Sequence, residues 1–259
     1  MNVTGEFGRG VTFRTADERF SLNLRARMQA RFTLAERPVE PKTEFQIRRA
    51  RLVLQGNLFG RDQQYYIQLG FSNQDTEPDL RLPLRDAYFI WSRFRDVSVR
   101  VGQMKVPFGR QRVVSSSAQQ MVDRSLAVGE FNLDRDVGLV LFSKDLFGLG
   151  SRLGYQLGAF GGDGRNRLSD VFGPLWVARE QVTPFGGFDD LVEADVQRLP
   201  RPRLALGFGA AYNQNSRRAR STFSDTYLEG FDQLHLGADL TFKLAGFSLA
   251  VEWLWRRAN

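Results

Sequence analysis

The chain has 259 residues, of which 42% are hydrophobic and 25% charged. This composition suits one large folded domain or two smaller ones, and it excludes a disordered or collagen-like chain. There is no cysteine and only one histidine, His235, so the chain has no disulfide framework, no thiolate nucleophile and no cluster of imidazoles for a transition metal. The net charge of +7 favours an anionic partner over a cationic one. We expect no cofactor and no bound metal.

The two ends and the hydropathy narrow the possibilities further. No stretch approaches 18 consecutive apolar residues, so we expect no transmembrane helix. The opening MNVTGEFGRG lacks the basic and apolar regions of a secretory signal. The final segment, FSLAVEWLWRRAN, stops at the end of an alternating apolar pattern. We therefore expect that the chain as given carries no signal peptide and is cut off at its C-terminal end.

Residues 20–34 carry the clearest secondary-structure signal. Apolar residues stand at every even position from Phe20 to Leu34, and polar residues stand at every odd one. A period of two over fifteen residues predicts a β-strand with one apolar and one polar face. Similar but less regular segments bring the number of predicted strands to about eleven. The other ten lie at 45–58, 63–73, 84–93, 97–104, 136–144, 152–160, 175–183, 204–213, 232–243 and from 247 to the end.

The connections between these strands alternate between long and short, with 184–203 as the clear exception. The others lie at 35–44, 59–62, 74–83, 94–96, 105–135, 145–151, 161–174, 214–231 and 244–246. Transmembrane β-barrels have this pattern, with tight turns on one rim and long loops on the other. We expect a helix only in the longest connection, between Ser115 and Val128.

Strand length and charge then predict which face meets lipid. Strands of nine to fifteen residues suit a tilted membrane crossing, whereas soluble sandwiches use shorter strands. The polar faces carry repeated arginines that would repel one another across neighbouring strands. If the apolar faces meet lipid, these arginines line a polar lumen that favours anions. The residues that we predict to line the pore and bind anions are Arg25, Arg27, Arg31, Arg49, Arg51, Arg100 and Lys105.

Aromatic residues near the predicted strand ends fit the same interpretation, because interfacial girdles of membrane barrels consist of such residues. They are Phe20, Phe32, Phe71, Trp91, Trp253 and Trp255. Their positions alone are also compatible with the core of a sandwich. That alternative, a soluble β-sandwich module that binds acidic glycans, stays open on the sequence.

Four motifs resemble, in the same order, those of the phosphate-selective porins of Gram-negative outer membranes. They are FQIRRARLVLQG (45–56), LRDAYFIW (84–91), GQMKVPFGRQ (102–111) before a serine-rich stretch, and RDVGLVLF (135–142). The opening GVTFRTADERFSLNLRARMQ is similar to the first strand of that family, and the likeness extends from about Gly10 to the end.

The resemblance implies a sixteen-stranded, homotrimeric barrel in the outer-membrane lipid that passes phosphate, pyrophosphate or other small anions. It also implies a single domain over 1–259 with a long loop at 105–135 folded into the pore. The apolar residues Val113, Met121, Val122, Leu126 and Val128 favour that inward fold, since an apolar loop tip is unfavourable in water. About five strands are missing against the family, whose barrels usually end on an aromatic residue, so we expect that the chain alone does not insert stably.

Other chemistry is disfavoured. There is no G-x-S-x-G motif, and His235 with Asp239 four residues on predicts a hydrogen-bonded wall rather than a catalytic pair. The glycine-rich run 161–164 is predicted as a loop, because it lacks the lysine and following helix of a phosphate loop. The acidic cluster Asp189, Asp190, Glu193 and Asp195 could hold a divalent cation but is better explained as an exposed turn. Arginines on strands also disfavour nucleic-acid binding. The sequence thus predicts a passive, non-enzymatic anion pore.

Overall fold

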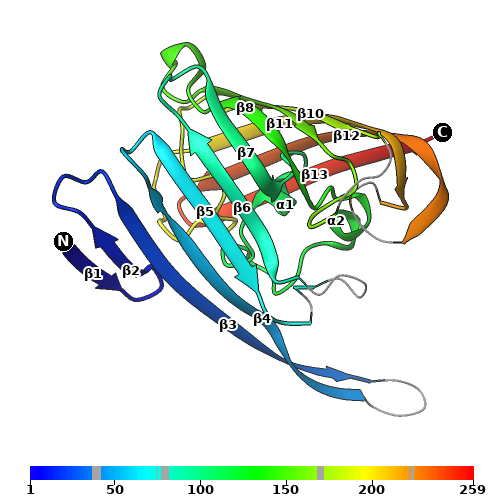
Figure 1. Cartoon of the computed structure of the whole chain (residues 1–259), viewed down its shortest axis with the longest axis horizontal. Helices are drawn as coiled ribbons and strands as arrows, with labels where there is room; N and C mark the ends of the chain where they lie inside the picture. Colours follow the sequence, from blue (N-terminus) through cyan, green and yellow to red (C-terminus); the bar gives the residue numbers. More distant parts are fainter. Residues whose placement is uncertain (37–41, 74, 77–81, 168–171, 221, 223–224) are drawn as a thin grey trace. The chain divides into compact units, whose positions relative to one another are not determined.

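The structure, a computed structural model, describes residues 1–36, 42–73, 75–76, 82–167, 172–220, 222 and 225–259. Its fold is all-β: thirteen strands follow chain order in an antiparallel, up-and-down sheet (Figure 1). The sheet is open, because within the described residues β1 (Asn2–Glu6) pairs only with β2 and β13 (Phe247–Ala258) only with β12. No described helix is long and apolar enough to span a membrane.

The chain divides into two compact units, Met1–Trp91 and Ser92–Asn259. Unit 1 contains the first six strands and unit 2 the remaining seven with three short helices. Besides β1, the strands of unit 1 are β2 (Gly10–Arg14), β3 (Ser21–Ala35), β4 (Lys42–Asn57), β5 (Gln63–Gly70) and β6 (Leu84–Trp91). Besides β13, the elements of unit 2 are β7 (Ser98–Lys105), α1 (Arg110–Val113), α2 (Leu126–Phe131), β8 (Arg135–Ser143), the 3-10 helix η1 (Leu146–Gly148), β9 (Leu153–Phe160), β10 (Leu175–Val182), β11 (Arg203–Arg218) and β12 (Thr226–Leu244).

The predicted all-β, up-and-down fold is confirmed, and the predicted strands agree with the observed ones to within a few residues over much of the chain. The number eleven is wrong, because the short strands β1 and β2 were not predicted. Each has only five residues, too few for a strong alternating pattern. Four predicted connections, 35–44, 74–83, 161–174 and 214–231, lie partly outside the described residues.

The predicted helix position is also wrong. Helix α1 precedes the range 115–128, and α2 begins at Leu126 and ends beyond that range at Phe131. The start of α2 is fixed by Ser125, whose hydroxyl accepts a hydrogen bond from the Val128 N–H. Such an N-cap satisfies one of the donors that a helix start leaves open.

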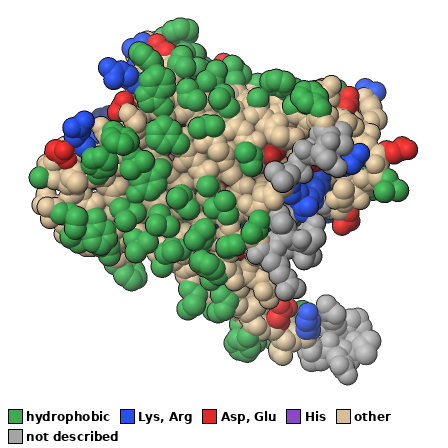
Figure 2. Space-filling view, viewed as in Figure 1, with side chains coloured by type: hydrophobic (Ala, Val, Ile, Leu, Met, Phe, Trp, Pro, Cys, Tyr) green, Lys and Arg blue, Asp and Glu red, His purple; other side chains and the backbone are tan. Residues whose placement is uncertain are grey.

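The apolar faces of the strands are exposed. On β3, Leu24 and Phe32 are 37% and 54% exposed, while the polar residues between them are less accessible. The six aromatic residues predicted for interfacial girdles are exposed as well, and hydrophobic side chains are spread widely over the face seen in Figure 2. Exposed apolar faces are the reverse of a soluble sandwich, whose core such residues would form. The sandwich alternative is therefore wrong.

Within unit 2, the apolar core lies between the β-strands of that unit, which we call the wall, and the connection 106–134. Val106, Phe108, Val114 and Leu133 of this connection are almost fully buried. Only part of the expected apolar set is buried: Val128 is inaccessible, whereas Met121, Val122 and Leu126 are exposed. The apolar residues near the two ends of the connection are buried, whereas those of its middle and Leu126 at the start of α2 are exposed.

Candidate anion pathway

Two arginines face each other across β3 and β4 in unit 1. The register pairs Arg27 with Arg51, and places Arg25 opposite Val53 and Gln29 opposite Arg49. These side chains belong to the face opposite the exposed Leu24 and Phe32. Like charges directly opposite each other are destabilising in a sheet. The arrangement therefore costs stability, and an anion on this face would offset that cost.

A β-bulge in β4 lies next to Arg49, which shares the face of Arg51 because the two residues are two positions apart. The pair Gln29 and Arg49 is followed by Ala30 and Ile47, so Arg48 is an extra residue on the β4 side. The bulge shifts the alternation by one residue and keeps Ile47 on the exposed apolar face, as bulges re-aim side chains in other sheets. Arg49 is buried and donates a hydrogen bond from Nη1 to Gln29 Oε1 at 2.6 Å.

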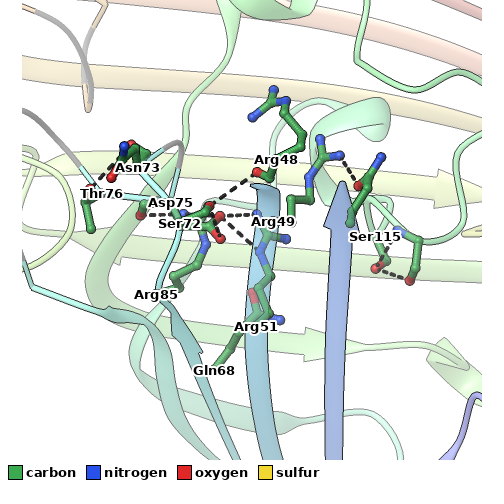
Figure 3. Close-up of polar contacts among 12 residues, drawn as sticks. Arg48, Arg49, Arg51, Gln68, Ser72, Asn73, Asp75, Thr76, Arg85 and Ser115 are labelled. Atoms are coloured by element: carbon green, nitrogen blue, oxygen red, sulfur yellow. Dashed lines mark hydrogen bonds and ion pairs between the residues drawn. The ribbon is translucent and has the colours of Figure 1, made fainter. Parts of the chain in front are cut away.

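Asp75 provides a carboxylate beside these arginines. Arg51 Nη2 lies 2.6 Å and Arg85 Nη1 3.1 Å from Asp75 Oδ1, and the Ser72 hydroxyl donates to Oδ2 at 2.9 Å. Figure 3 shows both guanidinium groups pointing toward this carboxylate. Burial raises the pKa of Asp75, but the hydrogen bond from Arg51 and the charges of Arg85 and Arg51 outweigh it and hold the pKa below its ordinary value.

In unit 2, a pair of buried arginines ties the connection 106–134 to the wall. Arg110 of α1 donates from Nε to Asp239 Oδ1 at 2.5 Å, and Arg179 of β10 donates from Nη2 to Asp239 Oδ2 at 2.6 Å. Arg179 also donates from Nη1 to the Phe108 carbonyl at 2.6 Å. Asp239 thus bridges two cations and fixes α1 against β10 and β12. We call this set of three residues the Asp239 bridge.

The connection 183–202 also contacts the Asp239 bridge, at Arg110. Asp190 Oδ2 lies 2.5 Å from Arg110 Nη1. Burial lowers the pKa of Arg110, but the carboxylates of Asp239 and Asp190 outweigh it and raise the pKa above its ordinary value. Glu193 accepts from the Gln120 N–H and donates its own N–H to the Ala118 carbonyl, both at 2.8 Å. Two long connections are therefore joined within unit 2.

The predicted acidic turn is consequently not simply exposed. Asp195 pairs with Arg203 at 2.6 Å and accepts the Gly246 N–H at 2.9 Å, and Lys243 donates to the Asp189 carbonyl at 2.9 Å. Among the described residues, no group of three or more acidic or histidine side chains has an arrangement that could hold a metal ion. The acidic side chains of this turn act as counterions and acceptors for its own unit.

The remaining predicted site residues have defined neighbours. Arg100 of β7 lies with its guanidinium 4.9 Å from the centre of the Phe142 ring. It lines a cavity of about 630 Å³ together with Arg110 and Arg179. Lys105 donates from Nζ to the carbonyls of Val113 and Val114 at 2.8 and 3.2 Å, at the end of α1. Arg31 of β3 stands opposite Gln46.

The predicted hydrogen bonding between His235 and Asp239 is wrong. Asp239 binds the two arginines described above, whereas the ring of His235 is buried and packs edge-on against Phe108 with centroids 5.9 Å apart. Neither His235 ring nitrogen has a hydrogen-bond partner in the described part of the chain. The run 161–164 is a loop as predicted, and the Gly162 N–H donates to buried Asp136 at 2.7 Å.

Sequence reasoning missed the Asp239 bridge. Arg110 stands in the motif GQMKVPFGRQ and Arg179 in an alternating strand, but their common partner lies 129 residues after Arg110. A single sequence carries no signal for a contact at that separation. The repeated arginines of β3 and β4, by contrast, were visible because register and period place them together.

An antiparallel meander with an exposed apolar face and a charged opposite face defines a membrane-barrel type of channel wall. The chain belongs to the family of phosphate-selective porins O and P, whose sequence model matches residues 20–259. Comparison with curated proteins found no match. Proteins of this family are outer-membrane porins, which are channels and not enzymes.

Proposed function

We propose that this protein is a passive outer-membrane pore that prefers small, phosphate-like anions, and that it acts as a homotrimer in outer-membrane lipid. Anions follow the arginine face of unit 1 formed by Arg25, Arg27, Arg49 and Arg51. Within unit 2, the connection 106–134 folds inward against the strands of its own unit. No chemical step is involved.

The opposition of Arg27 and Arg51 carries this proposal. Guanidinium groups bind phosphate in bidentate geometry, and a positively charged pore wall attracts anions into a low-dielectric passage. A wall selected for stability alone would not place two cations opposite each other. Arg100 and Lys105 carry positive charge within unit 2, where Lys105 also holds the end of α1.

The test is the reversal potential of the purified protein in planar lipid bilayers under a potassium chloride gradient. Stable, uniform conductance would overturn our expectation from the sequence that the chain alone does not insert stably, and its absence would refute the pore proposal for the chain as given. We expect chloride to be favoured over potassium. In the variant R27Q/R51Q the preference should fall by roughly fivefold or more, because a unit charge contributes about 1 kcal/mol at 4 Å even in water, and 1–2 kcal/mol corresponds to about 5–30-fold.

The matched control is R93Q/R152Q, which removes the same charge from two exposed turn residues of unit 2. It should leave the permeability ratio nearly unchanged. Potassium preference in the unmodified protein, or equal effects of the two double variants, would refute the arginine pathway. Phosphate added to the chloride solution should reduce the chloride current if phosphate-like anions share the path.

A further inference from the structure

A continuous row of uncharged hydrogen-bonding side chains crosses all six strands of unit 1. Each member is the register partner of the next on the neighbouring strand. In strand order they are Thr4, Thr12, Asn23, Gln55, Tyr66 and Tyr88. We call this row the neutral belt. It lies on the arginine-bearing face, since Asn23 and Arg25 are two residues apart on β3 and side chains alternate along a strand.

The side chains of the neutral belt are ordered by contacts with one another. Asn23 Nδ2 donates to Thr12 Oγ1 at 2.9 Å, and Gln55 Nε2 donates to Asn23 Oδ1 at 3.4 Å. The rings of Tyr66 and Tyr88 are stacked, with centroids 5.1 Å apart and planes at 12°. One end of the row is therefore a chain of oriented amides and hydroxyls, and the other end is a flat aromatic surface.

All six residues line one cavity of about 1010 Å³, and Arg25 lines it too. Arg25 lies two residues along β3 from Asn23, which corresponds to about 6.6–6.8 Å. Arg14 and Arg61, which also line the cavity, pair with Glu18. Arg25, in contrast, forms no ion pair with any residue in the described part of the chain. The two carboxylates that line the same cavity pair with other arginines, Glu6 with Arg9 and Glu18 with Arg14 and Arg61. The charge of Arg25 is thus left to the uncharged donors and acceptors next to it.

We propose, on the basis of the anion pore proposed above, that Arg25 and the neutral belt form a binding site for phosphorylated sugars. The phosphate binds Arg25, the sugar hydroxyls exchange hydrogen bonds with Asn23 and Gln55, and the C–H face of the sugar ring packs on the stacked rings of Tyr66 and Tyr88.

The chemistry of the cavity favours this ligand over bare phosphate. Phosphate binding needs positive charge and hydrogen-bond donors. The amide carbonyls and aromatic rings of the neutral belt add nothing to the binding of bare phosphate. Sugar hydroxyls both donate and accept, as do the hydroxyl and amide groups of the belt. Aromatic side chains bury large apolar surfaces while their polar ends keep hydrogen-bond partners. The volume is also that of a site for small organic molecules, which spans about 300–1,000 Å³.

The experiment measures block of the chloride current through the purified protein in planar bilayers by glucose 6-phosphate, inorganic phosphate and glucose. We expect glucose 6-phosphate to reach half-block at about one tenth of the phosphate concentration, which corresponds to about 1.4 kcal/mol. Glucose alone should not block at these concentrations, because it lacks the group that binds Arg25.

The variant N23L/Q55L removes the polar groups of the belt and keeps side chains of similar size. Its half-blocking concentration for glucose 6-phosphate should rise to within about twofold of that for phosphate, while block by phosphate stays unchanged. The matched control is T33V, a polar-to-apolar change farther along β3, which should keep the tenfold difference. If N23L/Q55L does not insert, Q55M tests the same point with an expected rise of about threefold.

The outcomes separate the two proposals. The sugar-phosphate site is overturned if glucose 6-phosphate and phosphate block the unmodified protein equally. It is also overturned if an inserted belt variant keeps the tenfold difference between their half-blocking concentrations. In both cases the anion pore still stands if the unmodified protein prefers chloride over potassium. Absence of chloride preference in the unmodified protein overturns the pore proposal itself.

Discussion

Replacing Asp239 by asparagine should destabilise unit 2 more than any exposed charge change. The side chains of Asp239, Arg110 and Arg179 are only 2%, 6% and 5% exposed. The variant D239N keeps the shape of the side chain but removes the negative charge that both guanidinium groups share. Removing one partner from a buried ion pair costs about 3–5 kcal/mol, because the remaining charge stays desolvated. The second carboxylate on Arg110, from Asp190, does not reach Arg179 in the contacts described above.

The assay is chemical unfolding in detergent micelles, followed by tryptophan fluorescence. Trp253 and Trp255 lie on β13, and Trp253 is the register partner of Ala238 on β12, so their emission reports on the wall that carries Asp239. We expect the free energy of unfolding to fall by about 3–5 kcal/mol in D239N. The control E6Q, which breaks the exposed Arg9 and Glu6 pair, should have no measurable effect.

A second variant tests the physical reason. In D239N/R179M, one of the two uncompensated guanidinium groups is replaced by an apolar side chain, so the double variant should be more stable than D239N alone. A loss below about 1 kcal/mol in D239N would mean that the bridge behaves like a surface pair, and a double variant no more stable than D239N would contradict the proposed cause.

Three further changes test other parts of the structure. The variant D75N should reduce the loss of folding stability at acid pH. Arg51 and Arg85 hold the pKa of Asp75 below its ordinary value, so the carboxylate stabilises the fold at any pH above its unfolded-state pKa of about 4. This contribution is lost as the pH falls through the lower pKa of the folded state. Unfolding free energies measured between about pH 5 and pH 2 should therefore depend less on pH in D75N, and an unchanged slope would contradict this ion pairing. The variant G162A should lower stability by at least about 1 kcal/mol in the same unfolding assay, since Gly162 has φ +91° and an added Cβ would lie 2.1 Å from a backbone oxygen; unchanged stability would argue against that backbone. The variant K105M should cost about 1.5–3 kcal/mol and increase current noise in bilayers, because the end of α1 loses the ammonium that binds two of its carbonyls; quiet channels of unchanged stability would argue against this role.

The fold was predictable from local pattern because each side chain of a strand reports its own environment. In residues 20–34 the alternation fixes both the strand and its apolar face, and β3 (Ser21–Ala35) has both features. The same pattern could not say whether the apolar face meets lipid or a core. Strand length and the sorting of connections favoured lipid, and the exposure of Leu24 and Phe32 agrees.

The arginine face was only partly predictable. Arg25 and Arg27 follow the period of β3 directly, and Arg49 and Arg51 follow that of β4. Gln46, which stands opposite Arg31, shares their face only because of the bulge at Arg48. A bulge shifts the alternation and has no reliable sequence signature in this stretch. The helices of 106–134 were misplaced for a similar reason, since α1 has four residues and depends on contacts with distant Asp239 and not on its own propensity.

The arginines of this protein fall into two physical classes that composition cannot separate. Arg110 and Arg179 share one buried carboxylate, so their charge holds a connection to the wall and is largely neutralised. Arg27 and Arg51 stand opposite each other, and the one carboxylate of Asp75 is shared between Arg51 and Arg85, so this cluster keeps a net positive charge. Arg25 continues the row toward the neutral belt. Charge that is matched by carboxylates stabilises structure, whereas charge placed against like charge raises the local potential at the expense of stability. The second class is therefore where anion selectivity should be sought, and the net charge of +7 overstates how many cations contribute to it.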